Sequence, residues 1–299
     1  MKRTLALLAL GLTGGACTLL VPVDLDQCTT DTDCTAKGWS GATCSHGACV
    51  NSSAISSDAG GDTSADAGIP PGPWGCVGHV KWPIDTTGEK RKIRNKILDI
   101  SEQPVTSVVL IACGKLDPEC TRPITTEPVT TGADGVFTLV LPRGFDGFVK
   151  ATPPAPMLPA LIFSPPLYED LDTVATGGEP LHAVSKADID ALLALVGASV
   201  DDTAGHLFAQ NLDCEDHLAS GVSLSLSVKG PTTKPYYYAG GLPNTDVLTT
   251  DGSGLGGFVN VPPGNVVLTA RNTLGQLYAT RQVVVKAKTV TYLTNAPSP

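Results

Sequence analysis

The chain has 299 residues, 42% of them hydrophobic and 16% charged, and a formal net charge of −9. So acidic a chain is repelled by the phosphate backbone of nucleic acids and by anionic lipid surfaces. One short basic run at residues 90–96 does not offset this charge. We therefore expect no nucleic-acid partner.

The first 16 residues have the three parts of a secretory signal. Lys2 and Arg3 form a basic start, residues 4–12 are mostly apolar, and small residues follow up to Ala16. The apolar run is too short to span a bilayer, which takes about 20 apolar residues. We therefore expect export. Loss of this segment leaves 18 basic and 29 acidic residues, a net charge of −11.

Cys17 follows Gly15 and Ala16, and this junction resembles the lipobox at which bacterial lipoproteins are cleaved and acylated. Where that family usually has leucine, three residues before the cysteine, this chain has Gly14. The resemblance implies membrane anchoring through lipid on Cys17, because several acyl chains hold a protein firmly whereas one holds it only marginally. The alternative is an ordinary signal peptide cut near Ala16, which would leave Cys17 as a thiol.

The chain has nine cysteines, an odd number that is awkward in an exported protein unless one has another use. With Cys17 acylated, eight remain for disulfides, which oxidising compartments permit. Four of these lie within 22 residues, too few to bury a core, so residues 28–49 should be a small module held by disulfides. Zinc is the alternative, but gaps of five and nine residues fit zinc ligands poorly. The four cysteines are Cys28, Cys34, Cys44 and Cys49.

Two segments connect this module to the rest of the chain and to the membrane. Residues 17–27 would be the lipidated tether. Residues 50–73 are rich in Ser, Gly, Ala, Asp and Pro and have almost nothing to bury, which predicts a flexible linker with a span of about 27 Å. The linker either holds the domains after it away from the membrane or is a spacer with no further role.

From Trp74 onward the pattern is typical of β-strands. Apolar runs at residues 105–113, 136–141 and 148–151 are separated by turns that contain Gly or Pro. Nearer the C-terminus apolar and polar residues alternate, which predicts strands with one buried face. The alternating sets are Val222, Leu224, Leu226 and Val228; Val266, Leu268 and Ala270; and Val283 and Val285. We expect the first two sets to face each other across one core.

The two halves of this region resemble each other. Gly78-His79-Val80 opens one half and Gly205-His206-Leu207 the other, and each half has a Thr-Thr-x-x-x-Gly turn, at residues 130–135 and 249–254. We read this as a diverged tandem repeat and predict a mainly β fold with two sandwiches of the immunoglobulin or transthyretin type, at residues 74–183 and 200–299. Cys76 and Cys214 both lie near the opening strands and are candidate partners. Cys113 and Cys120 should close a short loop.

One helix is predicted, within residues 184–199 and between the two sandwiches. Ser185 and Asp188 form a capping box. Apolar residues then follow at helical spacing, and Gly197 is suited to end the helix. The helix either packs at the junction of the sandwiches or docks a partner.

The segments at residues 249–254, 257–264 and 266–270 together resemble carboxypeptidase regulatory-like domains. In this family a Thr-Asp-x-x-Gly turn, a strand with an aromatic residue, a Pro-Pro-Gly turn and a closing strand belong to a transthyretin-like sandwich. The first half matches more loosely, since residues 142–147 depart from the usual turn. The layout also resembles acidic surface lipoproteins of myxobacteria. In enzymes such a domain accompanies a zinc peptidase domain, for which this sequence has no motif.

The sequence offers no catalytic constellation. The G-x-G-x-x-G match at residues 252–257 precedes a strand pattern and two prolines, which favours a hairpin over a nucleotide site. None of the five histidines has zinc-peptidase spacing, and no G-x-S-x-G elbow is present. Residues 213–217 carry metal-capable atoms but are typical of a solvated loop. We therefore expect no enzyme activity, no catalytic residues, no metal site and no cofactor.

The remaining candidate site is an aromatic triplet beside two glycines. Its rings offer stacking surfaces for a sugar or a peptide, although an edge strand with one buried ring is the alternative. The triplet consists of Tyr236, Tyr237 and Tyr238.

These features predict an exported, non-catalytic lipoprotein of the outer membrane that faces the cell surface or the periplasm. It would present β-sandwiches for adhesion to a surface protein or glycan. The alternatives are a structural envelope lipoprotein without a discrete ligand and an accessory subunit of a secreted hydrolase.

Overall fold

The computed structural model describes residues 30–36, 42–45, 48–51, 72–82, 87–125 and 127–299. The chain divides into two compact units, residues 1–57 and 58–299. The described part of the first unit contains α1 (Asp31–Ala36) and a hairpin of β1 (Ala42–Ser45) and β2 (Ala48–Asn51).

Several sequence predictions lie outside the described residues. These are the signal segment, the acylation of Cys17, residues 52–71 of the linker and Cys28; the first two residues of the predicted linker belong to β2. Backbone is described at Cys34, Cys44 and Cys49, with Cys44 opposite Cys49 in the hairpin, but their side chains are not. The pairing of the four clustered cysteines therefore stays a prediction.

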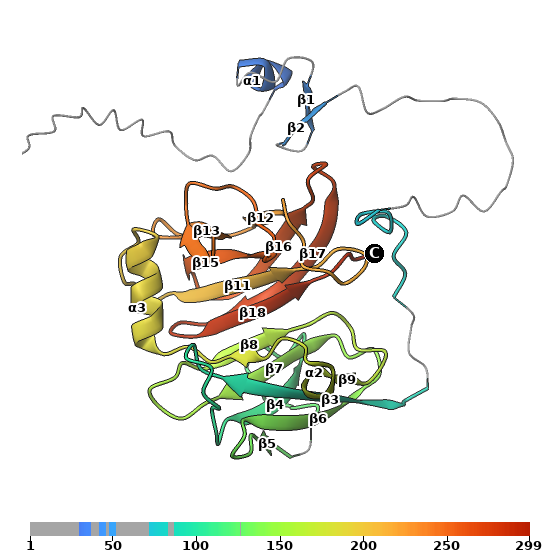
Figure 1. Ribbon diagram of the computed structural model, residues 1–299, viewed down its shortest axis with the longest axis vertical. Helices are drawn as coiled ribbons and strands as arrows, with labels where there is room; N and C mark the ends of the chain where they lie inside the picture. Colours follow the sequence, from blue (N-terminus) through green and yellow to red (C-terminus); the bar gives the residue numbers. More distant parts are fainter. Residues whose placement is uncertain (1–29, 37–41, 46–47, 52–71, 83–86, 126) are drawn as a thin grey trace, which may run out of the picture. The chain divides into compact units, whose positions relative to one another are not determined.

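The second unit is built mainly from three β-sheets (Figure 1). One sheet contains β10 (Leu181–His182), β3 (Lys90–Leu98) and β6 (Val136–Pro142), with β9 (Leu171–Asp172) beside β3. A second sheet has three strands, β12 (Ser223–Leu226), β16 (Gly264–Arg271) and β17 (Leu277–Val285). The third sheet has nine strands, in the order β14 (Leu242–Asn244), β13 (Lys234–Ala239), β15 (Leu255–Val261), β11 (Gly205–Asn211), β18 (Val290–Asn295), β8 (Ala160–Phe163), β7 (Gly147–Thr152), β4 (Val109–Gly114) and β5 (Val129–Thr130).

The two halves repeat one pattern of strand pairing. In the first half β3 pairs with β6, β4 with β7 and β7 with β8, all antiparallel. In the second half β11 pairs with β15, β12 with β16 and β16 with β17, again antiparallel. A parallel strand lies on the other side of β3 and of β11. The fold is therefore mainly β, with two sandwiches in tandem, as predicted.

The two sandwiches share a continuous sheet, which no pattern in the sequence indicates. β18 pairs parallel with β11 on one side and with β8 on the other, so that Thr291 lies between Leu207 and Leu161. Val290, Thr291 and Leu293 are fully buried or nearly so. The nine-stranded sheet therefore runs from one sandwich into the other without an edge between them (Figure 1).

The predicted helix is present as α3 (Lys186–Leu195), and its capping box between Ser185 and Asp188 is formed. The helix lies beside the nine-stranded sheet (Figure 1). Its buried residues Ile189, Leu192 and Leu193 pack with Tyr236, Val259 and Val290 of that sheet. The helix thus covers a sheet face. Successive residues Leu207 and Phe208 of β11 belong to different clusters, so in this half the sheet is covered on both faces.

Some expectations about the strands were wrong. β12 and β16 are neighbours in one sheet, with Leu226 opposite Leu268, and they do not face each other across the core. β12 ends at Leu226, and Val228 is 46% exposed. The run at residues 105–113 forms a strand only from Val109 onward. Periodicity predicts which face of a strand is buried, but not which strand lies beside it.

The opening motifs of the two halves are also not equivalent. Gly205-His206-Leu207 begins β11, whereas residues 78–80 lie outside the strands, with Gly78 at φ 82° in a turn. The strand that pairs as β11 does is β3. A short helix, α2 (Thr173–Thr176), was also not predicted.

Candidate functional site

The tyrosine triplet on β13 does not form the exposed stacking patch proposed from the sequence. Tyr236 and Tyr237 are only 2% and 3% exposed, because β13 lies inside the nine-stranded sheet where both faces are covered. The Tyr237 hydroxyl accepts a hydrogen bond from the Leu224 N–H at 2.8 Å, and burial raises the pKa of Tyr237 to about 12. Tyr238 is half-buried against the ring of Tyr236. The first two rings are core residues.

Two disulfides are present in the second unit. Cys113–Cys120 closes a loop after β4, and Cys76–Cys214 joins the segment before β3 to the loop after β11. Beside the second disulfide the Cys214 N–H donates to the Pro73 carbonyl oxygen at 2.9 Å. The Trp74 ring lies 4.9 Å from the ring of Tyr278. The start of the second unit is thus fastened to the second sandwich.

The motifs that suggested chemistry have structural roles. The described side chains include no group of three or more His, Cys, Asp or Glu that could hold a metal ion. Within residues 252–257 Gly257 belongs to β15, where an added Cβ would collide with the Leu207 carbonyl oxygen. This glycine allows β15 to approach β11. Of the loop at 213–217, Glu215, Asp216 and His217 are exposed. No helix in the described residues is long and apolar enough to cross a bilayer.

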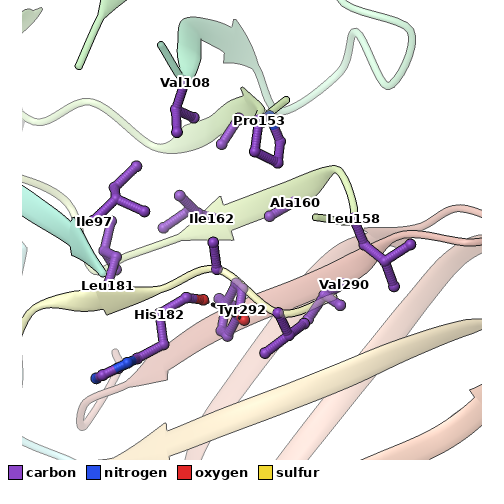
Figure 2. Close-up of a pocket in the computed structure, with 13 residues that line it drawn as sticks. Ile97, Val108, Pro153, Leu158, Ala160, Ile162, Leu181, His182, Val290 and Tyr292 are labelled. Carbon is purple, nitrogen blue, oxygen red and sulfur yellow. Dashed lines mark hydrogen bonds between the residues drawn. The ribbon is translucent and has the colours of Figure 1, made fainter. Parts of the chain in front are cut away.

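A hollow lies at the seam between the two sandwiches (Figure 2). Its lining is almost entirely apolar and comes from both halves, including Ile97 and Val108 from the first and Val290 from the second. The Tyr292 hydroxyl donates to the His182 carbonyl oxygen at 2.5 Å, while the imidazole of His182 points away (Figure 2). The hollow has a volume of about 20 Å³, which is enough for one water molecule. The hollow is a packing feature of the seam.

A larger cavity of about 130 Å³ lies beside α3, and we call it the α3 cavity. Its residues come from α3, from the loop that leads to β11, from β11 itself and from the turns before β8 and β18. The apolar lining residues are Leu158, Ile189, Leu193, Val200 and Ala204. The polar lining residues are Lys186, Asp190, Asp201, Asp202, His206 and Lys288.

His206 is the buried polar group of the α3 cavity. It is the second residue of β11 and is 5% exposed. Its Nδ1 accepts a long hydrogen bond of 3.5 Å from the Asn260 N–H. Burial lowers the pKa of His206 to about 4, although the nearby charge of Asp190 acts in the opposite direction. The imidazole is therefore neutral at neutral pH.

The tautomer of His206 follows from this hydrogen bond. Because Nδ1 accepts, the single proton of the neutral ring is on Nε2. The described part of the chain provides no hydrogen-bond partner for Nε2. Among the described side chains, the fully buried polar atoms without a partner are Asn260 Oδ1, Arg281 Nη1 and Asn295 Oδ1, so the Nε2 of His206 is accessible to solvent. In His206 this donor belongs to a residue that lines an open cavity.

The charged side chains of the α3 cavity are paired with one another or with hydroxyl groups. Lys186 donates to both oxygens of Asp190 at 2.7 Å, and Lys288 lies 3.8 Å from Asp202. Hydrogen bonds from Thr203 and from the Thr232 hydroxyl lower the pKa of Asp201. Lys186 and Asp190 are substantially exposed, as are Lys288 and Asp202. These two ion pairs therefore lie on the solvent side of the α3 cavity. Together with Asp201, the charged lining residues have a net charge of −1.

His206 was not among the predicted site residues, because a lone histidine in a strand pattern has no motif. The signal that could have found it is its place in β11. Its neighbours Gly205 and Leu207 are both buried, which shows that this part of β11 is covered on both faces. A polar ring in such a strand must find a partner or line a cavity.

Comparisons with known proteins found matches among solved structures alone. No protein-family model matches the chain, and no curated protein matches it. Solved structures that resemble it include the Bacillus anthracis TIE protein, at 11% identity and a TM-score of 0.24. That match covers 70% of this chain and 34% of the other, so this chain spans about a third of the TIE protein.

Two further matches are pilins. The shaft pilin SpaA of Lactobacillus rhamnosus GG has 12% identity and a TM-score of 0.22, with 71% of this chain and 99% of the pilin covered. BcpA, the major pilin subunit of Bacillus cereus, has 10% identity and a TM-score of 0.23, with 70% and 100% covered. At these values the matches support no conclusion about this chain, and we transfer no property of these proteins to it.

Proposed function

We propose that this protein is an exported lipoprotein, anchored to the outer membrane through Cys17, which presents its sandwiches to bind a surface protein or glycan without catalysing a reaction. The observation that carries this proposal is the Cys76–Cys214 disulfide, which fastens the start of the folded unit directly after the predicted linker. Disulfides form and persist in oxidising compartments. A disulfide at the point where the linker joins the folded unit holds that unit firmly to its tether. Such an arrangement is suited to presenting the sandwiches at a surface.

The side chains of the second unit support a binding role over catalysis. The α3 cavity contains carboxylates and a histidine, the residue types of acid–base chemistry. Its two ion pairs keep Lys186, Asp190, Asp202 and Lys288 engaged, and Asp201 accepts from two threonines. His206 is neutral, with Nδ1 already accepting a hydrogen bond. A general base would need a free acceptor, which this ring does not offer.

We also propose that both sandwiches are of the carboxypeptidase regulatory-like type. Residues 130–135 and 249–254 precede equivalent strands, β6 and β15. Residues 142–144 and 262–264 then lead to the equivalent strands β7 and β16. The turns that suggested the resemblance therefore occupy the same positions in both halves.

Anchoring is tested by replacing Cys17 with Ser and fractionating the cells. The unaltered chain should sediment with the outer membrane and incorporate radiolabelled palmitate, whereas C17S should be soluble and unlabelled. C17S that remained in the membrane fraction would refute the lipid anchor. Binding is tested separately with C17S, by capture of envelope proteins and by a glycan array. Absence of saturable binding in both assays would favour a structural envelope component.

A further inference from the structure

We propose that the α3 cavity is a binding site for a small neutral ring that carries a hydroxyl group, with phenol as the simplest example. This inference does not depend on the lipid anchor or on adhesion. It rests on the size of the cavity, its aliphatic lining and the Nε2–H of the lining residue His206, which has no protein partner in the described structure.

The size of the α3 cavity suits one six-membered ring. Its volume is about 130 Å³, and an apolar cavity of about 150 Å³ in another protein binds benzene. The α3 cavity is open to solvent beside the exposed pairs Lys186–Asp190 and Lys288–Asp202. A substituent on the ring can therefore extend outward.

The wall chemistry favours a ring with an apolar body. Five of the eleven lining residues are aliphatic, and three of these, Ile189, Leu193 and Ala204, are at most 4% exposed. A flat apolar ring would displace water from these surfaces, which is favourable. A sugar ring carries hydroxyls all around its edge, and those turned toward this wall would lose their hydrogen bonds to water.

The polar end of the α3 cavity selects an oxygen that accepts a hydrogen bond. The Nε2–H of His206 is a donor without a partner in the described structure, and its other ring nitrogen is held by the Asn260 N–H. A ligand oxygen placed there would satisfy this N–H. Without a ligand this accessible N–H bonds to water, which the ligand oxygen would replace.

The charges around His206 exclude an ionic group at this position. Three carboxylates and two ammonium groups line the α3 cavity, so that an anion would meet a net negative charge. A cation would face the hydrogen of the His206 Nε2–H, which is a donor and offers no lone pair. A hydroxyl group is neutral, and it can accept a hydrogen bond from the Nε2–H and donate one to a carboxylate. Asp190 is suited to be this carboxylate because its charge acts on His206.

The experiment compares phenol, benzene, benzoate, benzylammonium and glucose by ligand-observed NMR with the full chain in detergent. We expect saturable phenol binding that is at least tenfold tighter than that of the other four. In ¹⁵N-labelled protein only phenol should shift the Nε2 resonance of His206. Equal affinity for benzene and phenol, or tighter binding of benzoate, benzylammonium or glucose, would overturn the proposal, as would no saturable binding of phenol.

Two variants locate the site. Ala204→Leu adds three carbons to a residue that lines the α3 cavity, and it should weaken phenol binding at least tenfold. Ala191→Leu makes the same change at an exposed position of α3 and should leave binding unchanged. Unchanged binding by folded A204L would overturn the location. Should A204L not fold, the Nε2 shift in the unaltered protein decides, since a saturating phenol that leaves this resonance in place refutes the site.

Discussion

Thr131 and Thr250 make the same hydrogen bonds in the two sandwiches. The Thr131 hydroxyl donates to the Val105 carbonyl oxygen and accepts from the Val108 N–H, at 2.9 and 3.0 Å. The Thr250 hydroxyl donates to the Ala219 carbonyl oxygen and accepts from the Val222 N–H, at 2.7 and 3.0 Å. Each buried threonine thus joins the turn before β6 or β15 to the segment that enters β4 or β12. This bond pattern supports the tandem repeat independently of strand order.

Replacing either threonine with valine should destabilise the protein by about 1–3 kcal/mol, because a buried N–H loses its acceptor while the shape is kept. Thr131→Val and Thr250→Val have no common hydrogen-bond partner, so their effects on the free energy of unfolding should add. Chemical denaturation measures this. Thr→Ser at the same positions keeps the hydroxyl and is the control. Equal losses for the Val and Ser variants would mean that packing, and not the hydrogen bond, is what matters.

Gly135 and Gly254 also correspond. Both have a left-handed backbone, at φ 74° and 65°, and an added Cβ would lie 2.5 Å from the Ile97 carbonyl oxygen or 2.6 Å from that of Asn211. Gly254→Ala should therefore cost about 2–4 kcal/mol in stability. Gly252→Ala is the matched control, since nothing lies within 4 Å of its Cβ. A thermal melt in which both variants behave alike would contradict this account of the turn.

His206 should make stability depend on pH. Its folded-state pKa of about 4 is below the usual 6.5, so between these values the unfolded chain binds a proton that the folded chain does not. The stabilising contribution is present above pH 6.5 and falls as the pH is lowered toward 4, by about 3 kcal/mol in total. The charged groups that line the α3 cavity with His206 are Asp190, Asp201, Asp202, Lys186 and Lys288.

The measurement compares the free energy of unfolding at pH 7 and pH 5 for the unaltered chain and for His206→Gln. Between these values the unaltered chain should lose about 2 kcal/mol more than the variant. Two parallel pH profiles would show that His206 titrates alike in the folded and unfolded chain.

The two disulfides should differ in their contribution to stability. Cys76–Cys214 spans 138 residues of sequence and Cys113–Cys120 spans 7. If a disulfide acts by restricting the unfolded chain, these loop lengths correspond to about 5 and about 2.5 kcal/mol. Paired Cys→Ala variants, compared by denaturation in urea, test this. A larger loss from the short loop would indicate that native packing around Cys113, which is fully buried, outweighs loop entropy.

Local patterns in the sequence predicted much of the fold. The turns at 130–135 and 249–254, the strands that follow them, and α3 with its Ser185–Asp188 capping box depend on neighbouring residues. Strand partners depend on the whole chain, which is why the β18–β8 pairing at the seam was missed. Burial of both Tyr236 and Tyr237 has the same cause, since alternation predicts one wet face and β13 has none.

The candidate site was less predictable than the fold. The α3 cavity is assembled from the helix, the following loop and three strand ends that are far apart in sequence. His206 has no motif around it, and its unusual feature is an N–H whose partner is missing in three dimensions. Such a feature becomes visible only when every neighbour has been placed.

The fastening of residues 73–76 to the second sandwich determines how the molecule would bear tension. A pull on the chain before Trp74 reaches Cys76 and crosses the disulfide to Cys214, without passing through residues 77–213 between them. The first sandwich lies within this bypassed segment. A force applied between the linker and the C-terminal strands would therefore not stretch the first sandwich along its chain. Reduction of that one bond would place both sandwiches in series, and the extensible length of the protein would increase by the whole of the bypassed segment.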